Sequence, residues 1–391
     1  MKLAFVVQRY GLEISGGAEL HCRWVTEHMN KSCEVEVLTT RALDYVTWKN
    51  YYLEGRDLVN GIPVRRFSVS KTRNPESFGR IQSYILEEEH REEDEFRWLK
   101  EEGPFSPSLI KYIKKHQDDY DYFIFFSYRY YHSYWGVDAV PHKSILVPTA
   151  EHDPIIYLKI FKKLFRRPQA FIYNSWEERK MINDLSQNEH IPGDVVGVGT
   201  EIPACYTGEI FCKKHNITGD YIIYIGRIDE NKGCRQLFNY FLRFKRETDS
   251  EIKLVLVGST ILKIPSHPDI LHLGFLPEDD KFNGLDGSLL LVMPSFYESL
   301  SMVTLEAWAL GKPVLANGQC EVLKGQCLRS NGGLFYENYQ EFKEALSTLI
   351  SLPELRLAIG RNGQKYFTKN YAWQVIENKY LSIIKRLEER K

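Results

Sequence analysis

Several hallmarks of common enzyme classes are missing from this chain of 391 residues. No Gly-x-Gly-x-x-Gly fingerprint follows the first strand-like segment, residues 2–7, so the sequence does not support a nicotinamide or flavin dinucleotide site. The seven cysteines form no Cys-x-x-Cys pair and no Cys/His set at zinc spacing. We therefore expect reduced thiols, no metal, no bound cofactor and a cytoplasmic location.

An excess of charge and long apolar runs are also missing. The formal net charge of -1 offers no basic field that would attract nucleic acid, so we expect no nucleic-acid partner. No segment approaches the roughly 18 apolar residues that a membrane-spanning helix requires. The apolar start MKLAFVVQRY is shorter than the apolar core of a secretion signal. The sequence predicts a soluble protein, peripheral to a membrane at most.

Short apolar runs alternate with helical patterns along most of the chain, which is typical of α/β domains with parallel sheets. The length exceeds one ordinary core, so we expect two domains. In the first half we expect strands at 2–7, 35–39, 64–69, 122–127, 144–148, 170–174 and 195–198. In the second half we expect them at 221–226, 253–258, 271–274, 289–293, 313–316 and 333–336.

Periodicity is lost around residues 197–212, where glycine and proline accumulate, and this indicates the domain junction. We predict an N-terminal domain of residues 1–205, completed by a closing helix within 372–391, and a second domain of residues 206–371. The acidic segment 75–116 is expected to be helical and inserted between the third and fourth strands. It is either a solvated helical excursion or a regulatory or partner surface.

Glu298 falls in the loop after an expected strand, and Glu306 falls in the helix that follows, with seven residues between them. In one interpretation Ser299 or Ser301 caps this helix, the N–H groups of residues 300–303 face an anion, and the carboxylates meet hydroxyl groups. In the other, an ordinary helix carries two solvated glutamates.

The loop 226–233 reads GRIDENKG and directly follows an expected strand. Arg227 and Lys232 therefore lie at the carboxyl end of that strand, where two cations can flank a diphosphate. The alternative is a surface ion pair with Asp229 or Glu230.

Two further loops belong to the first domain. Gly16 and Gly17 follow the first strand and precede a helix, so they either let the backbone approach a ligand closely or form a simple turn. His152, between Glu151 and Asp153, follows another strand and is either a cleft residue or a structural histidine.

Taken together, these motifs resemble the family-4 retaining glycosyltransferases of group 1, over nearly the whole chain. The motifs are GGAE at 16–19, EHD at 151–153, GRIDENKG at 226–233, LVLVG at 254–258, LGFLPEDD at 273–280 and ESLSMVTLEAWALGKPVLA at 298–316. The glutamate pair and its LEA-x-A-x-G-x-PV tail are the specific part. The resemblance implies the GT-B fold, with two Rossmann-like domains facing a cleft and a C-terminal helix that closes back on the N-terminal domain.

The resemblance also implies a role for each matching residue. Arg227 and Lys232 would bind the donor diphosphate, Glu298 the donor sugar and Glu306 the nucleotide ribose. Of these, Glu298, Arg227 and Lys232 would act in catalysis together with His152, near the sugar and acceptor. The remaining donor contacts would come from Gly16 and Gly17 over the phosphates, from Leu300, Ser301, Met302 and Val303 through their N–H groups, and from Gly274, Phe275 and Leu276 at the base.

The chain departs from the common family pattern in two places. After Glu298 it reads Ser-Leu-Ser where many members read Gly-Phe-Gly, which leaves backbone donors in place but alters the sugar pocket. The stretch 317–336 replaces the usual Gly-Val-Pro-Glu run, and we assign no role to its Cys320 and Cys327.

From the resemblance we predict a retaining, metal-independent hexosyltransferase of polysaccharide biosynthesis. The donor would be UDP-glucose, with GDP-mannose next, and the acceptor a glycan or a lipid-linked glycan. The alternatives are a sugar-nucleotide epimerase or hydrolase, and a sugar-nucleotide-binding protein without catalysis.

The segment 158–167 reads LKIFKKLFRR and places five basic residues on one helical face. It predicts either peripheral contact with an anionic membrane at the inner face of the plasma membrane or a core-facing helix with a basic solvent face.

Overall fold

The computed structural model describes residues 1–14 and 16–390. Ser15, which precedes the Gly-Gly pair, and Lys391, the last residue of the expected closing segment, lie outside the described residues. The chain divides into two compact units. Unit 1 comprises residues 1–198 and 373–391, and unit 2 comprises residues 199–372, whereas the sequence analysis drew the boundaries at 205/206 and 371/372.

Unit 1 is built on a sheet of eight strands in the order β3-β4-β2-β1-β5-β6-β7-β8. All neighbours pair in parallel except β3 and β4. Because the order reverses between β1 and β5, the loops after these two strands flank the switch point of the sheet. The strands are β1 Lys2–Val6, β2 Glu34–Thr40, β3 Gly55–Val59, β4 Ile62–Phe67, β5 Tyr122–Phe126, β6 Ser144–Val147, β7 Ala170–Tyr173 and β8 Gly193–Val195.

Two strands of unit 1 differ from the prediction. β3 was not expected, and it pairs antiparallel with β4 through a turn in which Asn60 and Gly61 have φ angles of 47° and 78°. An Asn-Gly pair with positive φ at both positions is the usual two-residue hairpin turn, so it was a signal for this strand. β8 covers Gly193–Val195, whereas a strand was predicted at 195–198. Val195 is the last residue of β8 that pairs with β7, and the apolar residues after it lie outside the sheet.

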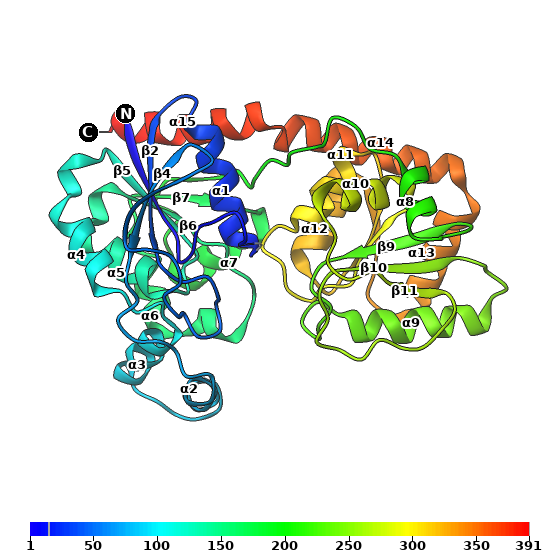
Figure 1. The fold of residues 1–391 in the computed structure, drawn as a ribbon, viewed down its shortest axis with the longest axis horizontal. Coiled ribbons are helices and arrows are strands. Elements are labelled where there is room, and N and C mark those ends of the chain that lie inside the picture. The colour runs from blue at the N-terminus through cyan, green and yellow to red at the C-terminus, as the bar shows by residue number, and fades with distance from the viewer. Residues whose placement is uncertain (15, 391) are drawn as a thin grey trace. The chain divides into compact units, whose positions relative to one another are not determined.

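Helices cover this sheet and form the predicted acidic insertion (Figure 1). The insertion between β4 and β5 consists of three helices whose apolar residues, among them Ile85, Trp98 and Ile113, join the core of unit 1. Its acidic residues are divided: Glu76, Glu93 and 87–89 are exposed, whereas Glu95 and Glu102 are buried. The helices of unit 1 are α1 Gly17–Met29, α2 Pro75–Glu87, α3 Glu92–Glu102, α4 Pro107–Lys115, α5 Tyr131–Ala139, α6 Lys159–Leu164, α7 Trp176–Ser186 and α15 Trp373–Glu388.

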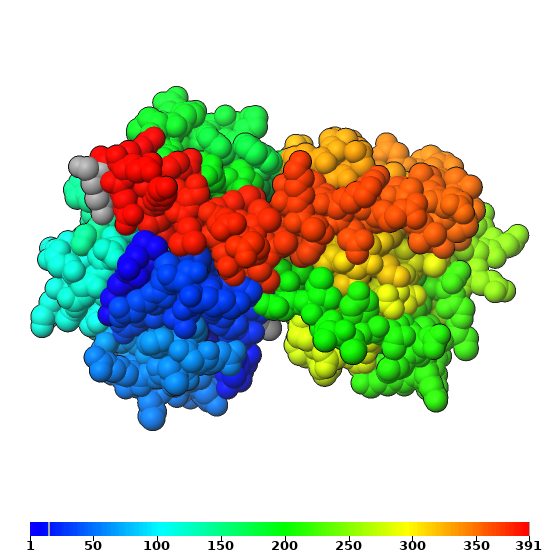
Figure 2. Space-filling view, turned by 90° about the horizontal axis from the view of Figure 1, so that it is seen from above, coloured from blue at the N-terminus to red at the C-terminus, as the bar shows by residue number. Residues whose placement is uncertain are grey.

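The last helix, α15, belongs to unit 1 although the whole of unit 2 precedes it in the chain. It packs against α1, β7 and β8, and Figure 2 shows it beside the N-terminal segment (red beside blue). The His28 and Trp373 rings stack with centroids 3.7 Å apart, and His28 Nδ1 lies 2.7 Å from Glu377 Oε1. The predicted closing of the C-terminal helix on the N-terminal domain is therefore confirmed.

Of the basic segment 158–167, residues Lys159–Leu164 form α6, and the apolar side of this helix is occupied by the protein's own core. Ile160, Phe161 and Leu164 are fully buried, while Lys163 lies 2.6 Å from Glu92 at the surface. This is the core-facing helix with a basic solvent face, and the membrane contact stays a prediction. In the part of the chain that the structure describes, no helix is long and apolar enough to span a bilayer.

Unit 2 contains a fully parallel sheet of six strands in the order β11-β10-β9-β12-β13-β14. The order reverses between β9 and β12, which makes the loops after these strands the expected ligand-binding edge. In Figure 1, α9 runs along one side of this sheet and α10 and α11 lie on the other. The strands are β9 Tyr221–Ile225, β10 Lys253–Val257, β11 Ile270–His272, β12 Leu291–Met293, β13 Val314–Asn317 and β14 Gly333–Tyr336. The helices are α8 Gly208–Lys214, α9 Cys234–Glu247, α10 Glu278–Gly287, α11 Met302–Ala309, α12 Glu321–Ser330, α13 Tyr339–Ser351 and α14 Pro353–Tyr371.

Candidate functional site

The two loops at the switch point of unit 2 are joined directly. The N–H of Phe296 donates to Asn231 O at 3.2 Å, and the side chain of Asn317 donates to Pro294 O at 3.0 Å. The loop 226–233 after β9 is thereby tied to the loop 294–301 after β12. These are the segments in which the sequence analysis placed the donor-binding residues.

Glycines allow these loops to approach one another closely. Gly233 has a φ of 68°, and a Cβ atom there would lie 1.9 Å from Pro294 O. Gly258, which follows β10, has a φ of 137°, and its Cβ would lie 2.0 Å from Gly226 O. Both positions combine a backbone conformation that suits glycine with a contact that excludes any side chain.

Lys232 and Glu298, two predicted site residues from different loops, form an ion pair with Lys232 Nζ 2.7 Å from Glu298 Oε1. The exposed fractions of their side chains are 26% and 11%, so the pair is partly shielded from water. Lys232 Nζ also donates to Tyr297 O at 3.4 Å. The structure therefore brings together the cation expected at the phosphate and the carboxylate expected at the sugar.

Asp229 organises the loop that carries both predicted cations. Its carboxylate is buried, forms an ion pair with Arg227 and accepts a hydrogen bond of 2.8 Å from the backbone N–H of Lys232. The alternative interpretation, an ion pair between Arg227 and Asp229, is thus present, but Asp229 is buried and not at the surface. Sequence reasoning missed this positioning role, although an Asp three residues before a loop lysine is the pattern of a side-chain-stabilised turn.

Helix α11 begins without the side-chain cap that the sequence led us to expect. Ser301 is the N-cap residue with a φ of 68°, and its hydroxyl lies 2.9 Å from Thr304 Oγ1, with no hydrogen bond from that side chain to the first-turn amides. Ser301 is therefore the N-cap residue by position, but the predicted capping by its side chain is wrong, whereas capping by Ser299 stays a prediction. The hydroxyl of Ser301 thus contacts a side chain of the first turn, that of Thr304, and not a backbone N–H. A helix start without a side-chain cap keeps its N–H groups, at Met302 and Val303, for another acceptor.

Glu306 lies inside unit 2, on α11, rather than on a solvated helix face. Its side chain is 3% exposed, and its Oε1 atom lies 2.9 Å from the Nζ atom of Lys281 on α10. Its Oε2 atom is buried and has no hydrogen-bond partner among the residues described. Burial raises the pKa of Glu306, and the charge of Lys281 opposes this rise.

Cys320 lies at the start of α12, where its thiol interacts electrostatically with Glu298 and Lys232. It is 3% exposed, and burial raises the pKa of its thiol to about 12, so the sulfur is a neutral, small apolar neighbour of the ion pair. Cys327 lies at the other end of the same helix and is equally buried. Through Cys320, the segment that departs from the family pattern thus lies near Glu298 and Lys232, two of the predicted site residues.

Gly274, Phe275 and Leu276, the predicted base contacts, lie in the loop after β11. Gly274 has a φ of 71° and its carbonyl accepts a 2.7 Å hydrogen bond from the N–H of Gly258. Phe275 is 73% exposed. This loop leads into α10, and Lys281 on that helix contacts Glu306.

The predicted residues of unit 1 lie at the carboxyl edge of its own sheet. A Cβ atom on Gly16 would lie 2.3 Å from Glu19 Oε2, because Glu19 folds back to pair with Arg9 at 2.6 Å. Gly17 is the first residue of α1, and a Cβ atom added there would meet no atom within 4 Å. His152 is exposed, and its Nε2 atom lies 2.6 Å from the hydroxyl of Tyr157.

The chain contains one Asp-x-Asp triplet, Asp119 to Asp121, but it precedes β5 and so lies at the opposite edge of the sheet from the loops just described. Asp121 accepts a 2.7 Å hydrogen bond from the N–H of Lys2, and Asp119 lies 2.7 Å from His116. Over residues 1–14 and 16–390, no group of three or more His, Cys, Asp or Glu side chains is arranged to hold a metal ion.

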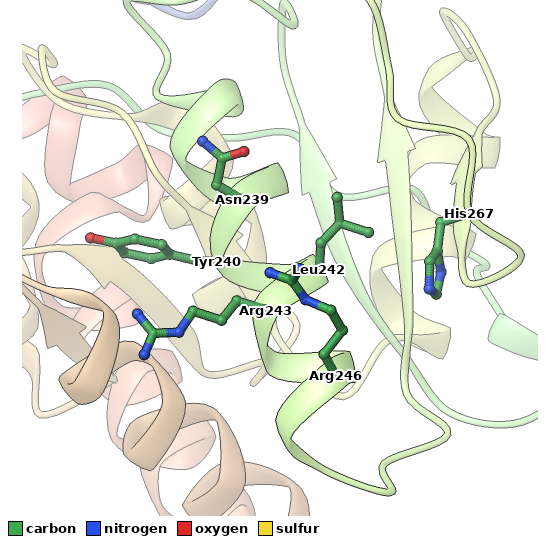
Figure 3. A pocket seen from close by; sticks show the side chains of 6 residues that line it. All are labelled: Asn239, Tyr240, Leu242, Arg243, Arg246 and His267. Carbon is green, nitrogen blue, oxygen red and sulfur yellow. The ribbon is translucent and has the colours of Figure 1, made fainter.

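A surface pocket in unit 2 lies beside α9 and contains none of the predicted site residues (Figure 3). Asn239, Leu242 and Arg246 line it together with His267, and Tyr240 and Arg243 border it on the same helix. Arg243 is already engaged, since it pairs with Glu247 at 2.7 Å and its guanidinium lies over the ring of Tyr339. The chemistry predicted from sequence lies at the loops after β9 and β12 instead.

Comparison with known proteins bears on these loops directly. Residues 209–366, which include every predicted site residue of unit 2, match the family model described as glycosyl transferases group 1. Unit 2 is a group 1 glycosyltransferase domain. This confirms the resemblance to group 1 glycosyltransferases, while the assignment to family 4 stays a prediction.

The chain is also similar in sequence to a curated protein and in fold to solved structures. The glycosyltransferase 1 domain-containing protein 1 of Xenopus tropicalis is 24% identical over 245 residues, which cover 62% of this chain and 63% of that protein. The chain thus spans less than two thirds of the length of that relative. Sucrose-phosphate synthase from Thermosynechococcus elongatus and HepE from Anabaena in complex with UDP-glucose match with TM-scores of 0.70 and 0.71, each at 15% identity and over 100% of both chains. These likenesses confirm the predicted GT-B fold.

Proposed function

We propose that this glycosyltransferase moves a hexose with retention from a nucleoside diphosphate sugar to a glycan or lipid-linked acceptor, in the assembly of a polysaccharide. One observation carries the proposal. The buried carboxylate of Glu306 has an oxygen without a partner among the described residues, on the same short helix whose first turn follows the Lys232–Glu298 pair. An unpaired buried acceptor is costly unless a ligand hydroxyl fills it, and a ribose carries two such hydroxyls.

The groups around the donor suit departure of a diphosphate. Arg227, Lys232 and the first-turn N–H groups of α11 would stabilise the negative charge that develops as the bond between the anomeric carbon and the phosphate oxygen breaks. A new bond from the acceptor oxygen would form on the same face, and the acceptor proton would pass to the departing diphosphate. The protein itself would supply this charge stabilisation, without a metal ion.

The two glutamates fit separate tasks rather than an acid/base couple. A retaining glycosidase places two carboxylates across one anomeric carbon. Here Glu298 is held by Lys232 from the loop after β9, and Glu306 by Lys281 from α10. We therefore assign Glu298 to the donor sugar and Glu306 to the ribose.

For the donor we propose UDP-glucose, with GDP-mannose as the second choice. The Anabaena protein HepE, whose fold this chain shares, was solved in complex with UDP-glucose. A thermal-unfolding screen of the intact protein with UDP-glucose, GDP-mannose and ADP-glucose tests the donor directly. We expect UDP-glucose to raise the melting temperature most, since ligand binding stabilises by mass action. If no sugar nucleotide raises it, the proposed donor site is wrong.

Transfer should not depend on a divalent metal ion. We expect a chelator such as EDTA to leave the rate of sugar transfer within about twofold of its value without chelator, because protein cations and helix amides neutralise the diphosphate. The measurement is hexose transfer to an acceptor mixture, with and without chelator, and with Mg²⁺ restored. A loss of transfer that Mg²⁺ reverses would contradict metal independence.

A further inference from the structure

Lys281 was not among the residues expected at the site, yet it is buried in unit 2. It lies in the first turn of α10 and is 8% exposed. Its Nζ atom lies 2.9 Å from Glu306 Oε1 and 2.7 Å from Glu278 Oε2. Glu278 is largely exposed, whereas Glu306 is buried, so Lys281 connects an interior carboxylate to one at the surface.

Because Glu306 is buried, its ionisation depends on the charge of Lys281. Burial lowers the pKa of Lys281, but the two carboxylates together raise it above its ordinary value, so the ammonium group stays charged. Burial acts on Glu306 in the opposite sense and raises its pKa, which favours the neutral acid. The ammonium of Lys281 is the group that opposes this, since the other charged neighbour, Glu278, acts in the same direction as burial.

The remaining neighbours of Glu306 carry no compensating charge. α14 packs on α11 and contributes the amide of Gln364, which donates to Ala309 O at 3.1 Å, and the ring of Tyr366, which packs on Trp308. β12 carries only apolar side chains, and β13 adds to its apolar residues the uncharged Asn317. Lys281 is therefore the cation that acts on this carboxylate within the described residues.

The geometry also divides the two oxygens of Glu306. Lys281 engages Oε1, and Oε2 remains buried and without a partner among residues 1–14 and 16–390. The lysine thus engages one oxygen of the carboxylate, while the other oxygen has no hydrogen-bond partner among the described residues.

We propose that Lys281 is a positioning residue of the donor site, which keeps Glu306 ionised and holds its free oxygen ready for a ribose hydroxyl of the nucleotide. This inference rests on the proposed function. It assigns to α10 a part in nucleotide recognition that the motif residues alone do not provide.

The test measures binding of UDP to the intact protein by calorimetry from about pH 6 to about pH 9, for the wild type, Lys281→Met and Lys281→Arg. We expect Lys281→Met to weaken UDP binding at least tenfold at the lower pH, and to regain affinity as the pH rises. The sign follows because removing the ammonium raises the pKa of Glu306, and each unit by which this pKa exceeds the pH cuts the ionised fraction about tenfold. Lys281→Arg should stay close to the wild type, since it retains the charge.

Two comparisons make the outcome decisive. The analogue 2′,3′-dideoxy-UDP lacks the ribose hydroxyls, so the wild type and Lys281→Met should bind it equally. The double variant Lys281→Met with Glu306→Gln leaves no unpaired buried charge to destabilise the fold, and it should bind UDP weakly with no pH dependence over this range. If the wild type binds UDP and Lys281→Met binds it as tightly at every pH, Lys281 has no positioning role. If the wild type binds no nucleoside diphosphate, the proposed function fails instead.

Discussion

Replacing Lys232 with Met is expected to lower kcat for sugar transfer by about 100- to 1000-fold, the loss found when one preorganised group that stabilises developing charge is removed. Lys232 Nζ lies 2.7 Å from Glu298 Oε1, so its charge is already held at the place where the proposed diphosphate leaves. The partial burial of the pair strengthens this interaction relative to one in open water. The measurement is steady-state transfer from the best donor of the thermal screen.

A neighbouring cation provides the matched control for Lys232. Arg235, on the first turn of α9, pairs with Glu230 and is exposed at the surface. Exposed ion pairs contribute about 0–1 kcal/mol, so Arg235→Met should leave kcat and the melting temperature nearly unchanged. Lys232→Met with wild-type kcat would show that the charge of this lysine has no part in the reaction.

Gly233→Ala is expected to lower the free energy of unfolding of unit 2 by about 3 kcal/mol or more, and to disrupt donor binding as well. Two costs combine at this position. The φ of 68° strains any residue with a Cβ atom, and that atom would lie 1.9 Å from the carbonyl oxygen of Pro294. Since Pro294 belongs to the loop of Glu298, relief of the overlap must separate the two loops of the site.

Gly219 separates these two costs, because it belongs to the same unit and shares the backbone conformation without the crowding. Its φ is 75°, and no atom lies within 4 Å of an added Cβ. Gly219→Ala should therefore cost only the strain of the left-handed backbone, about 1–2 kcal/mol. Urea unfolding of both variants, followed by a probe in unit 2, measures the difference. Equal losses would mean that the contact with Pro294 is absorbed without consequence.

The parallel sheets could be predicted from the sequence because their strands are apolar throughout. β5, with the sequence YFIFF, and β9, with YIIYI, are buried along their whole length, as strands covered on both faces must be. β3 escaped prediction for the opposite reason. Its middle residues Arg56, Asp57 and Leu58 are exposed, so it has no apolar run and depends on pairing with β4 for its place in the sheet.

The candidate-site residues that belong to local sequence motifs could be predicted, and those brought in by packing could not. Glu298, Glu306, Arg227 and Lys232 were identified from their spacing and from the ends of predicted strands. Lys281 was not, because a lysine in the first turn of an acidic helix looks like a solvated residue, and only the packing of α10 beside α11 shows that it is buried against Glu306. The missing helix cap at Ser301 was equally invisible, because it depends on a φ angle and not on residue type.

The position of α15 affects the order in which the protein can fold during its synthesis. Unit 1 is interrupted after residue 198 and resumes only at residue 373, so the 174 residues of unit 2 are translated in between. At a typical elongation rate of 5–20 residues per second, this interval lasts roughly 10 to 35 seconds. The surface formed by α1, β7 and β8 stays uncovered throughout, and it is accessible to chaperones until the ribosome delivers α15. Unit 2, although translated second, can be the first to reach its final structure.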